Sequence, residues 1–215
     1  MKSFVIAIDG HDKSQQASDR CIKSGKLHGL SVEKFSAITP KDDVYKICAS
    51  FGIDTSNFSD FYSRLENSIA CLLSHYSLWN TCIDLNEPIA IFEHDAVITS
   101  PLPATPPNFV GNIGHPSFGR FNTPSTIGWG KLVSKPYFPG CHAYIVTPMG
   151  ARLLTEKAKK EARTPDIYLD TRRFSWLQEH YPYCAYADDR FTTIQHKRGC
   201  AAKHNNDKGY EILEV

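Results

Sequence analysis

The most informative run of this sequence is Glu87-Pro88-Ile89-Ala90-Ile91-Phe92-Glu93-His94-Asp95. Residues 89–92 form a short apolar segment after a proline, which is typical of a buried strand in a sheet covered on both faces. In open α/β sheets, ligands bind outside the carboxyl ends of the strands. Because side chains alternate along a strand, we expect Glu93 and Asp95 to point one way and His94 the other.

Two carboxylates that point toward one place repel each other unless a cation lies between them or one is protonated. Carboxylate oxygens are the ligands that Mg²⁺ and Mn²⁺ prefer, and these ions commonly join protein carboxylates to substrate phosphates. Glu93 and Asp95 therefore predict a divalent-cation site that handles a diphosphate. The alternative that stays open is a pair of solvated acids at a strand end.

The segments before this run predict a parallel β-α-β unit and a long helix. We expect strands over 3–8 and 31–35 with a helix over 14–24 between them. Over 60–84, apolar residues recur every three or four positions, as on a mostly buried helix. This order of elements predicts the α/β class.

The second half of the chain begins irregularly. Prolines and glycines are frequent over 101–140 and exclude long regular elements, so we expect an ordered, ligand-facing excursion there. A strand over 142–146 precedes a helix opening at Thr147-Pro148. A second opening at 164–166 leads into 167–177, and a polar, basic tail follows over 195–208.

Composition bounds the class of protein. A chain of 215 residues with 41% hydrophobic residues is predicted to form a single domain with a sizeable core. The net charge of +1 gives no global field that calls for nucleic acid or an acidic membrane. The 7 scattered cysteines favour buried free thiols in a reducing cytoplasm, and no apolar run is long enough to span a bilayer. We therefore expect a soluble, cytoplasmic protein.

Several segments together resemble glycosyltransferase family 25, the lipooligosaccharide and procollagen galactosyltransferase group. The run 69–79 is similar to the family's Gly-x-x-x-Ser-His-x-x-x-Trp helix, with Ala70 in place of the glycine. Phe92 to Asp95 occupies the place of its Leu-Glu-Asp-Asp motif, with His94 as the departure. The run 140–151 resembles its Gly-x-x-x-Tyr segment, and 165–167 resembles its later Pro-Val-Asp.

The resemblance implies a GT-A type fold, a Rossmann-like mixed sheet flanked by helices. It implies a hexosyl- or pentosyltransferase that uses a nucleotide-diphosphate sugar and a divalent cation, Mn²⁺ or Mg²⁺, and inverts the anomeric carbon. Residues 1–100 would bind the nucleotide sugar and residues 101–215 would face the acceptor. The site residues expected on this basis are Asp166 and Glu93 for catalysis, Ile8, Asp9, Ser74, His75 and His94 for donor binding, and Asp95, Glu93 and His196 for the cation.

Other readings of the same residues remain open. Asp166 is the candidate base for the acceptor hydroxyl, but it also suits a plain helix cap. The acceptor is a glycan, a protein hydroxyl or a hydroxymethylated DNA base; DNA would need phosphate contacts from the basic tail and from 120–135. A nucleotide-sugar-binding or glycan-binding module without activity is the alternative of a different class. A nucleotidyltransferase would need a glycine-rich phosphate loop, which residues 9–12 provide poorly.

Overall fold

The computed structural model describes residues 1–60, 63–117, 119–188, 190–195 and 211–213. The helices are α1 (Asp12–Leu27), the 3-10 turn η1 (Pro40–Asp42), α2 (Val44–Phe51), α3 (Leu65–Leu85), α4 (Pro148–Glu161) and α5 (Pro165–Tyr168). The strands are β1 (Lys2–Ala7), β2 (Glu33–Ser36), β3 (Ile89–Glu93), β4 (Ala96–Ile98), β5 (Val110–Asn112), β6 (Gly128–Lys131), β7 (Ala143–Val146), β8 (Gln178–Tyr181), β9 (Ala185–Ala187), β10 (Phe191–Thr192) and β11 (Glu211–Ile212).

Seven strands form one mixed sheet in the order β2-β1-β3-β7-β5-β8-β6. β1 runs parallel to both β2 and β3, whereas β7 runs antiparallel to β3 and β5. β5 pairs parallel with β8, and β6 closes the edge antiparallel to β8. The predicted α/β class, with a Rossmann-like mixed sheet flanked by helices, is confirmed.

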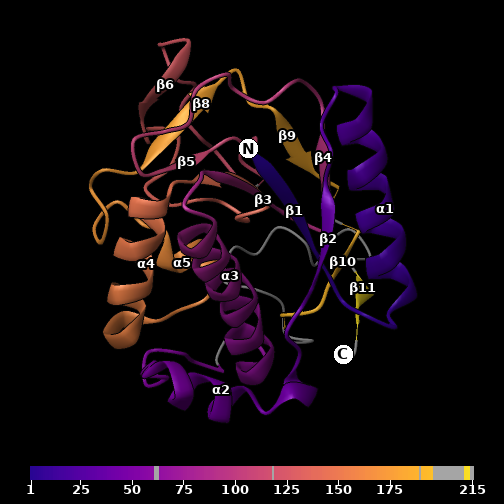
Figure 1. The fold of residues 1–215 in the computed structure, drawn as a ribbon, viewed down its shortest axis with the longest axis vertical. Helices are drawn as coiled ribbons and strands as arrows, with labels where there is room; N and C mark the ends of the chain where they lie inside the picture. The colour runs from indigo at the N-terminus through magenta and orange to yellow at the C-terminus, as the bar shows by residue number, and fades with distance from the viewer. Residues whose placement is uncertain (61–62, 118, 189, 196–210, 214–215) are drawn as a thin grey trace.

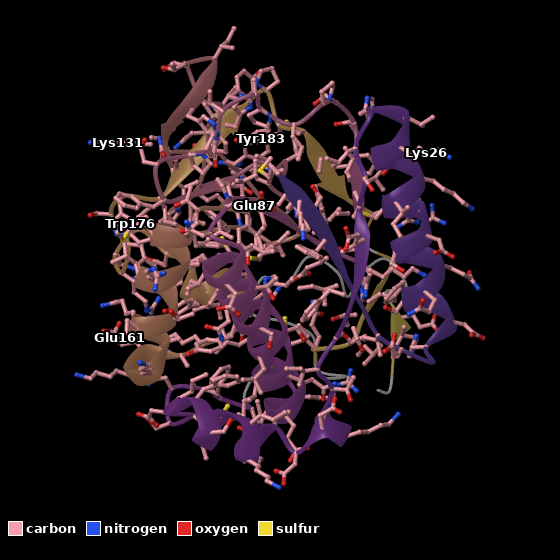
Figure 2. The ribbon with its side chains drawn as sticks, in the orientation of Figure 1. Lys26, Glu87, Lys131, Glu161, Trp176 and Tyr183 are labelled. Carbon is pink, nitrogen blue, oxygen red and sulfur yellow. The ribbon has the colours of Figure 1, made fainter. Side chains whose placement is uncertain are left out.

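The amino-terminal β-α-β unit is confirmed, with ends shifted by a few residues. Helix α1 begins after His11, whose side chain accepts a hydrogen bond from the backbone N–H of Ser14, and it ends at His28. Ser14, Ala17 and Cys21 are buried on one side of α1, and Lys26 lies on its outer side (Figure 2). The crossover returns the chain to β2 at the edge of the sheet.

Strand β3 is covered on both faces, as its sequence predicts. Ile89 and Ile91 belong to the core that contains the α3 side chains, whereas Ala90 and Phe92 belong to the core that contains Cys21 of α1. Figure 1 shows α1 on one side of the sheet and α2, α3 and α4 on the other. Successive side chains along β3 therefore face the two helical layers in turn, one toward α3 and the next toward α1.

Helix α3 is the long helix that the apolar spacing predicts. It covers Leu65–Leu85, five residues later at its start than the predicted 60, and it ends at Asn86, which has a left-handed conformation (φ 51°). Pro88 follows and cannot continue a helix. Most of α3 is buried, including the polar residues Ser68, Ser74 and His75.

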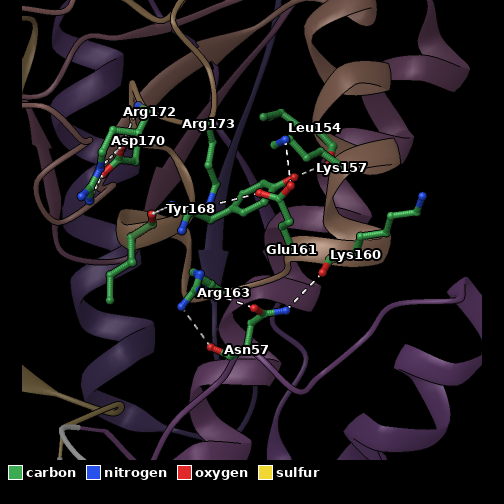
Figure 3. A network of polar contacts seen from close by, with 11 residues as sticks. Asn57, Leu154, Lys157, Lys160, Glu161, Arg163, Tyr168, Asp170, Arg172 and Arg173 are labelled. Atoms are coloured by element: carbon green, nitrogen blue, oxygen red, sulfur yellow. Dashed lines mark hydrogen bonds and ion pairs between the residues drawn. The ribbon is translucent and has the colours of Figure 1, made fainter.

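The second predicted helix opening leads to a single turn, so the prediction of an element over 167–177 is wrong. Helix α5 ends at Tyr168 because the following residues pair with the excursion instead. Phe138 donates its N–H to the carbonyl of Leu169, and Thr171 donates its own to Pro136. Arg173 donates to the carbonyl of Ile167 and forms an ion pair with Glu161 of α4, as Figure 3 shows.

The irregular segment 101–140 contributes two short strands, β5 and β6, to the main sheet, which its prolines and glycines did not reveal. The part of this segment around residues 133–134 is held by the carboxylate of Glu179 on β8, a residue that is only 1% exposed. That carboxylate accepts the N–H groups of Val133 and Ser134 at 2.7 and 2.8 Å and the hydroxyl of Tyr183 at 3.0 Å. A buried, fully hydrogen-bonded carboxylate holds an otherwise irregular segment in one conformation.

The six cysteines within the described ranges are free thiols, and five of them are buried. Burial raises the pKa of Cys21 and Cys82 to about 12, so these thiols are protonated at neutral pH. Within the same ranges, no helix is both long and apolar enough to cross a bilayer.

Candidate active site at the carboxyl end of the central strand

A pocket lies where β1 and β3 end. Its walls come from the end of β1, the loop after β2, one side of α3, the end of β3 and a short segment near the tail. The lining residues are Ile6, Ile8, Ala37, Ile38, Thr39, Pro40, Asn67, Ala70, Cys71, Ser74, His75, Glu93, His94, Thr193 and Ile194. The pocket has the place that open α/β sheets reserve for ligands.

Five of the predicted site residues line this pocket: Ile8, Ser74, His75, Glu93 and His94. The other described ones are not among the lining residues. Asp9 accepts a hydrogen bond from the hydroxyl of Ser36 on β2, Asp95 follows His94 in the turn after β3, and Asp166 lies on α5. His196 and the basic tail residues Lys197, Arg198, Lys203 and Lys208 lie outside the described residues.

Ser74 fastens α3 to the loop after β2. Its hydroxyl oxygen accepts the N–H of Ile38 at 2.9 Å, and the hydroxyl donates to the carbonyl of Ala70 at 3.0 Å. Ser74 thereby fixes the 37–40 wall of the pocket.

His75 is the centre of a buried chain of hydrogen bonds. Its Nδ1 lies 2.9 Å from the hydroxyl of Tyr144 on β7, and its Nε2 lies 3.1 Å from Oε1 of Glu93. The indole N–H of Trp79 donates to the same Tyr144 hydroxyl at 2.8 Å. His75 is 1% exposed and Trp79 and Tyr144 are fully buried, whereas the Glu93 side chain is 25% exposed. The chain therefore runs from the core to a carboxylate at the pocket.

Burial lowers the pKa of His75 to about 3, so the imidazole is neutral at physiological pH. Since a neutral imidazole carries a single N–H, one nitrogen is a donor and the other an acceptor. His75 therefore acts on Glu93 by hydrogen bonding rather than as a permanent positive charge.

Cys71 joins His75 and Glu93 in a group whose ligand atoms all lie within 4.8 Å of one another. Cys71 and His75 are one helical turn apart on α3, so both face β3. Burial, and then the negative charges of Glu93 and Asp166, raise the pKa of the Cys71 thiol well above its usual value. A soft metal would need the thiolate and the His75 Nε2 lone pair together. That lone pair is available only when the imidazole proton is on Nδ1.

His94 lies on the opposite side of the sheet from Glu93. Its Nδ1 is 2.9 Å from the hydroxyl of Ser14 on α1, and its ring contacts that of Phe191, with centroids 5.1 Å apart. The Ser14 oxygen also accepts the N–H of Ile8 at 2.9 Å, and the hydroxyl keeps both a proton to donate to His94 Nδ1 and a lone pair to accept from it. Burial lowers the pKa of His94, which favours a neutral ring.

Asp95 follows the end of β3, where residues 94 and 95 form a turn into β4. The strand alternation on which we predicted a shared direction for Glu93 and Asp95 therefore ends at Glu93. Asp95 Oδ1 is buried and has no hydrogen-bond partner among the described residues. Burial is the main cause of the raised pKa of Cys21 on α1 and of the lowered pKa of His142. The negative charge of Asp95 adds to the first shift and opposes the second. Asp95 does not line the pocket, but it directly follows the lining residue His94, and a carboxylate oxygen without a hydrogen-bond partner suits a cation.

Asp166 is the second residue of the short helix α5 and is partly buried; the N-cap position is held by Thr164. Its Oδ1 accepts the N–H of Ile167 at 2.8 Å. Desolvation raises the pKa of Asp166, which makes it a stronger base than an exposed aspartate. The charges of Glu93 and Asp166 both raise the pKa of Cys71 and of Cys141, so the two carboxylates lie near the same pair of thiols.

The residues that sequence reasoning missed are those that complete the environment of Glu93. Tyr144 belongs to the run that carried the family resemblance, yet it was not among the expected site residues. The four-residue spacing from Cys71 to His75 to Trp79 on one helix was the available signal for Cys71. Asn67 and the segment at Thr193 carry no comparable signal.

A family model described as glycosyltransferase family 25 (LPS biosynthesis protein) matches residues 1–106 of the chain. The matched residues carry β1, α1, α3, β3 and most of the pocket wall, whereas Tyr144 and Asp166 lie beyond them. No curated protein matches the chain. Residues 1–106 are thus a glycosyltransferase family 25 domain, and the protein is a glycosyltransferase.

Proposed function

We propose that this enzyme transfers a sugar from a nucleoside-diphosphate sugar to an acceptor hydroxyl, with inversion and with a divalent cation. The observation that carries the proposal is the pocket at the ends of β1 and β3, which combines apolar walls with the Glu93 carboxylate. Ile6, Ile8 and the 37–40 loop offer apolar surface for a nucleoside. Glu93 and His94 border the end where a diphosphate and its cation would lie.

Asp95 and Glu93 would hold the cation, because Asp95 offers a buried oxygen without a hydrogen-bond partner among the described residues and both are hard oxygen donors. When bound, the cation neutralises the charge that develops on the departing diphosphate. When Ser14 donates its hydroxyl proton to Nδ1, a neutral His94 would carry its proton on Nε2 and could donate it to a phosphate or ribose oxygen.

Asp166 is the proposed base. The acceptor oxygen forms a bond to the anomeric carbon, and its proton passes to the Asp166 carboxylate. The bond from the anomeric carbon to the diphosphate oxygen breaks, and its electron pair leaves with the nucleoside diphosphate. Two observations support this role. The pKa of Asp166 is raised, and Asp166 lies near Cys71 and Cys141, the two thiols whose pKa values Glu93 also raises.

The acceptor stays a prediction: a glycan, a protein hydroxyl or a modified DNA base. Salt-sensitive binding of the enzyme to duplex DNA would favour the DNA acceptor, and no retention at low salt would exclude it.

The proposed function is tested by incubating the enzyme with a panel of nucleoside-diphosphate sugars and Mn²⁺, with and without chelator. Slow release of nucleoside diphosphate from one donor, lost with chelator, is the expected result. Melting temperatures measured with the same panel detect binding independently, because a ligand that binds the native state stabilises it. Binding of a donor without any hydrolysis or transfer would instead favour a silent nucleotide-sugar-binding module.

A further inference from the structure

The hydrogen-bond chain Trp79–Tyr144–His75–Glu93 admits one direction of donation within the described residues. An indole N–H is a donor only, so Tyr144 accepts from Trp79 at 2.8 Å. The Tyr144 proton then points elsewhere, and the acceptor within reach is Nδ1 of His75 at 2.9 Å. With Nδ1 accepting, the single imidazole proton is on Nε2, which donates to Glu93 at 3.1 Å.

The opposite tautomer fails at two places. If Nδ1 carried the proton, the Tyr144 oxygen would accept twice, and the proton of this fully buried hydroxyl would have no acceptor among the described residues. The Nε2 lone pair would then face a Glu93 oxygen 3.1 Å away, so two acceptors would oppose each other. A buried donor without a partner costs about 1–3 kcal/mol. Both effects favour Nε2–H.

From this geometry we propose that Tyr144 and Trp79 lock His75 as an Nε2–H donor, which makes His75 a positioning residue that holds Glu93 and not a metal ligand. Since the proposal assigns a task to the carboxylate that the proposed function uses, it rests on that function for its consequence in catalysis. The tautomer itself is independent of the function.

The proposal also explains the order of residues on α3 and β7. His75 and Trp79 are one turn apart and both hydrogen-bond to the Tyr144 hydroxyl. The Tyr144 ring stacks on His75 with an angle of 17° between the planes. Tyr144 is on β7, the antiparallel neighbour of β3, and its register partner Ile91 is two residues before Glu93. The acid is therefore braced from a helix and from the adjacent strand.

The same lock decides between two uses of the Cys71–His75–Glu93 group. A metal ion on His75 would displace the proton to Nδ1 and leave the Tyr144 proton without an acceptor. The locked tautomer therefore disfavours a soft metal at this group, although the three ligand atoms lie close together.

Nitrogen-15 NMR of histidine-labelled enzyme tests the tautomer without any need for activity. We expect His75, assigned by its loss in His75→Gln, to show a pyridine-like Nδ1 and a pyrrole-like Nε2 at neutral pH. Adding Co²⁺ should produce no thiolate charge-transfer absorption that depends on Cys71. A pyrrole-like Nδ1, or a Cys71-dependent cobalt band, would overturn the proposal.

Tyr144→Phe removes the proton that fixes the lock, and Tyr168→Phe is its matched control. Tyr168 is also fully buried and contacts Trp79, on which its ring stacks, and its hydroxyl donates to the carbonyl of Leu154 at 2.6 Å. Both variants lose a buried phenol hydrogen bond, so both should melt earlier. We expect about tenfold weaker binding of UDP with Mn²⁺ in Tyr144→Phe alone, and a mixed tautomer at His75 in that variant alone.

A second pair separates donation from bulk. In His75→Gln the amide N–H₂ can still donate to Glu93, so UDP binding should be largely retained, whereas His75→Leu should lose it. Equal losses in the glutamine and leucine variants, or an unchanged His75 tautomer in Tyr144→Phe, would contradict the positioning role. If wild-type enzyme shows the expected tautomer but binds no donor of the panel, the proposed function fails and the lock stands.

Discussion

The two sides of the carboxyl end of β3 differ in how completely their polar groups are satisfied. On the α3 side, Glu93 ends a chain in which Trp79, Tyr144 and His75 each have a partner. On the α1 side, Asp95 keeps a buried oxygen without a hydrogen-bond partner within the described residues. A satisfied network positions a carboxylate, and an orphaned oxygen invites a ligand. Glu93 is therefore held in place by the protein, whereas Asp95 has an oxygen that is free to bind a ligand such as a cation.

The largest effect is expected from Asp166, a carboxylate that belongs to neither side. Asp166→Asn should lower sugar transfer by about 100-fold or more, the usual contribution of a general base. Donor affinity should stay unchanged, because both sides of β3 remain intact. Steady-state transfer and calorimetric binding of UDP with Mn²⁺ measure the two quantities. Wild-type turnover in a folded variant would remove Asp166 from the mechanism.

Substituting Glu93 and Asp95 one at a time tests whether the two sides of β3 differ. Asp95→Asn and Glu93→Gln should each lower turnover on the order of 100-fold, as for loss of one electrostatic contact in a transition state. Their stabilities should differ. Glu93→Gln should cost about 1.5–3 kcal/mol, because His75 loses a charged acceptor. Asp95→Asn should leave the free energy of unfolding of the chelator-treated protein unchanged or higher, because it removes a carboxylate whose buried Oδ1 has no hydrogen-bond partner among the described residues.

Urea denaturation of the two variants reads out this contrast. Equal destabilisation by Asp95→Asn and Glu93→Gln would show that the two sides are alike and would break the comparison.

The pH dependence of stability tests the α3 side without mutation of Glu93. The pKa of His75 is about 3 in the folded protein, against 6.5 when unfolded. Below pH 6.5 the unfolded chain binds a proton that the native protein refuses, so stability falls from pH 6.5 toward pH 3 and is fully present above pH 6.5. His75 contributes at most about 1.4 kcal/mol per pH unit to this slope.

The measurement is urea unfolding of chelator-treated protein between pH 4 and pH 8, for wild type and His75→Gln. Burial lowers the pKa of His94 and His142 as well, so the variant should keep part of the slope. A slope that is identical in both proteins would mean that His75 is charged or exposed in the native state.

The smallest effect concerns the α1 side. Ser14→Ala removes the acceptor of the Ile8 N–H and the hydroxyl that hydrogen-bonds to His94, so it should cost about 1–2 kcal/mol and slightly weaken binding of the sugar donor. The matched control is Ser18→Ala on the same helix, where the buried hydroxyl only donates to the carbonyl of Gln15. Ser18→Ala should cost less. If both serines cost the same and His94 keeps its NMR signals, Ser14 does not orient His94.

Local patterns predicted the β-α-β unit, the long helix and the buried central strand, because apolar spacing reports directly on which side of an element is covered. The same patterns could not find β5, β6 and β8. Short strands rich in glycine or polar residues form here because neighbouring strands and Glu179 supply partners distant in sequence. The prediction of an element over 167–177 is wrong for the same reason, because the backbone after Tyr168 hydrogen-bonds to residues 136–138 instead of continuing the helix.

The candidate site divides in a similar way. Motif spacing pointed to Glu93, Ser74 and His75, which line the pocket. It could not reveal that Tyr144 and Trp79 set the His75 tautomer, because that depends on contacts between α3 and β7. Strand alternation also could not extend to Asp95, because β3 ends two residues earlier in a turn.

The claim on which the rest depends is that Glu93 and Asp95 hold a cation which carries the diphosphate. Electron paramagnetic resonance of Mn²⁺ in the presence of UDP measures that affinity directly. Glu87→Gln is the matched control, since Glu87 lies at the opposite end of the same strand (Figure 2). Wild type and Glu87→Gln should bind Mn²⁺ alike, and Glu93→Gln and Asp95→Asn should bind it at least about tenfold more weakly. Equal affinity in all four proteins would contradict the claim.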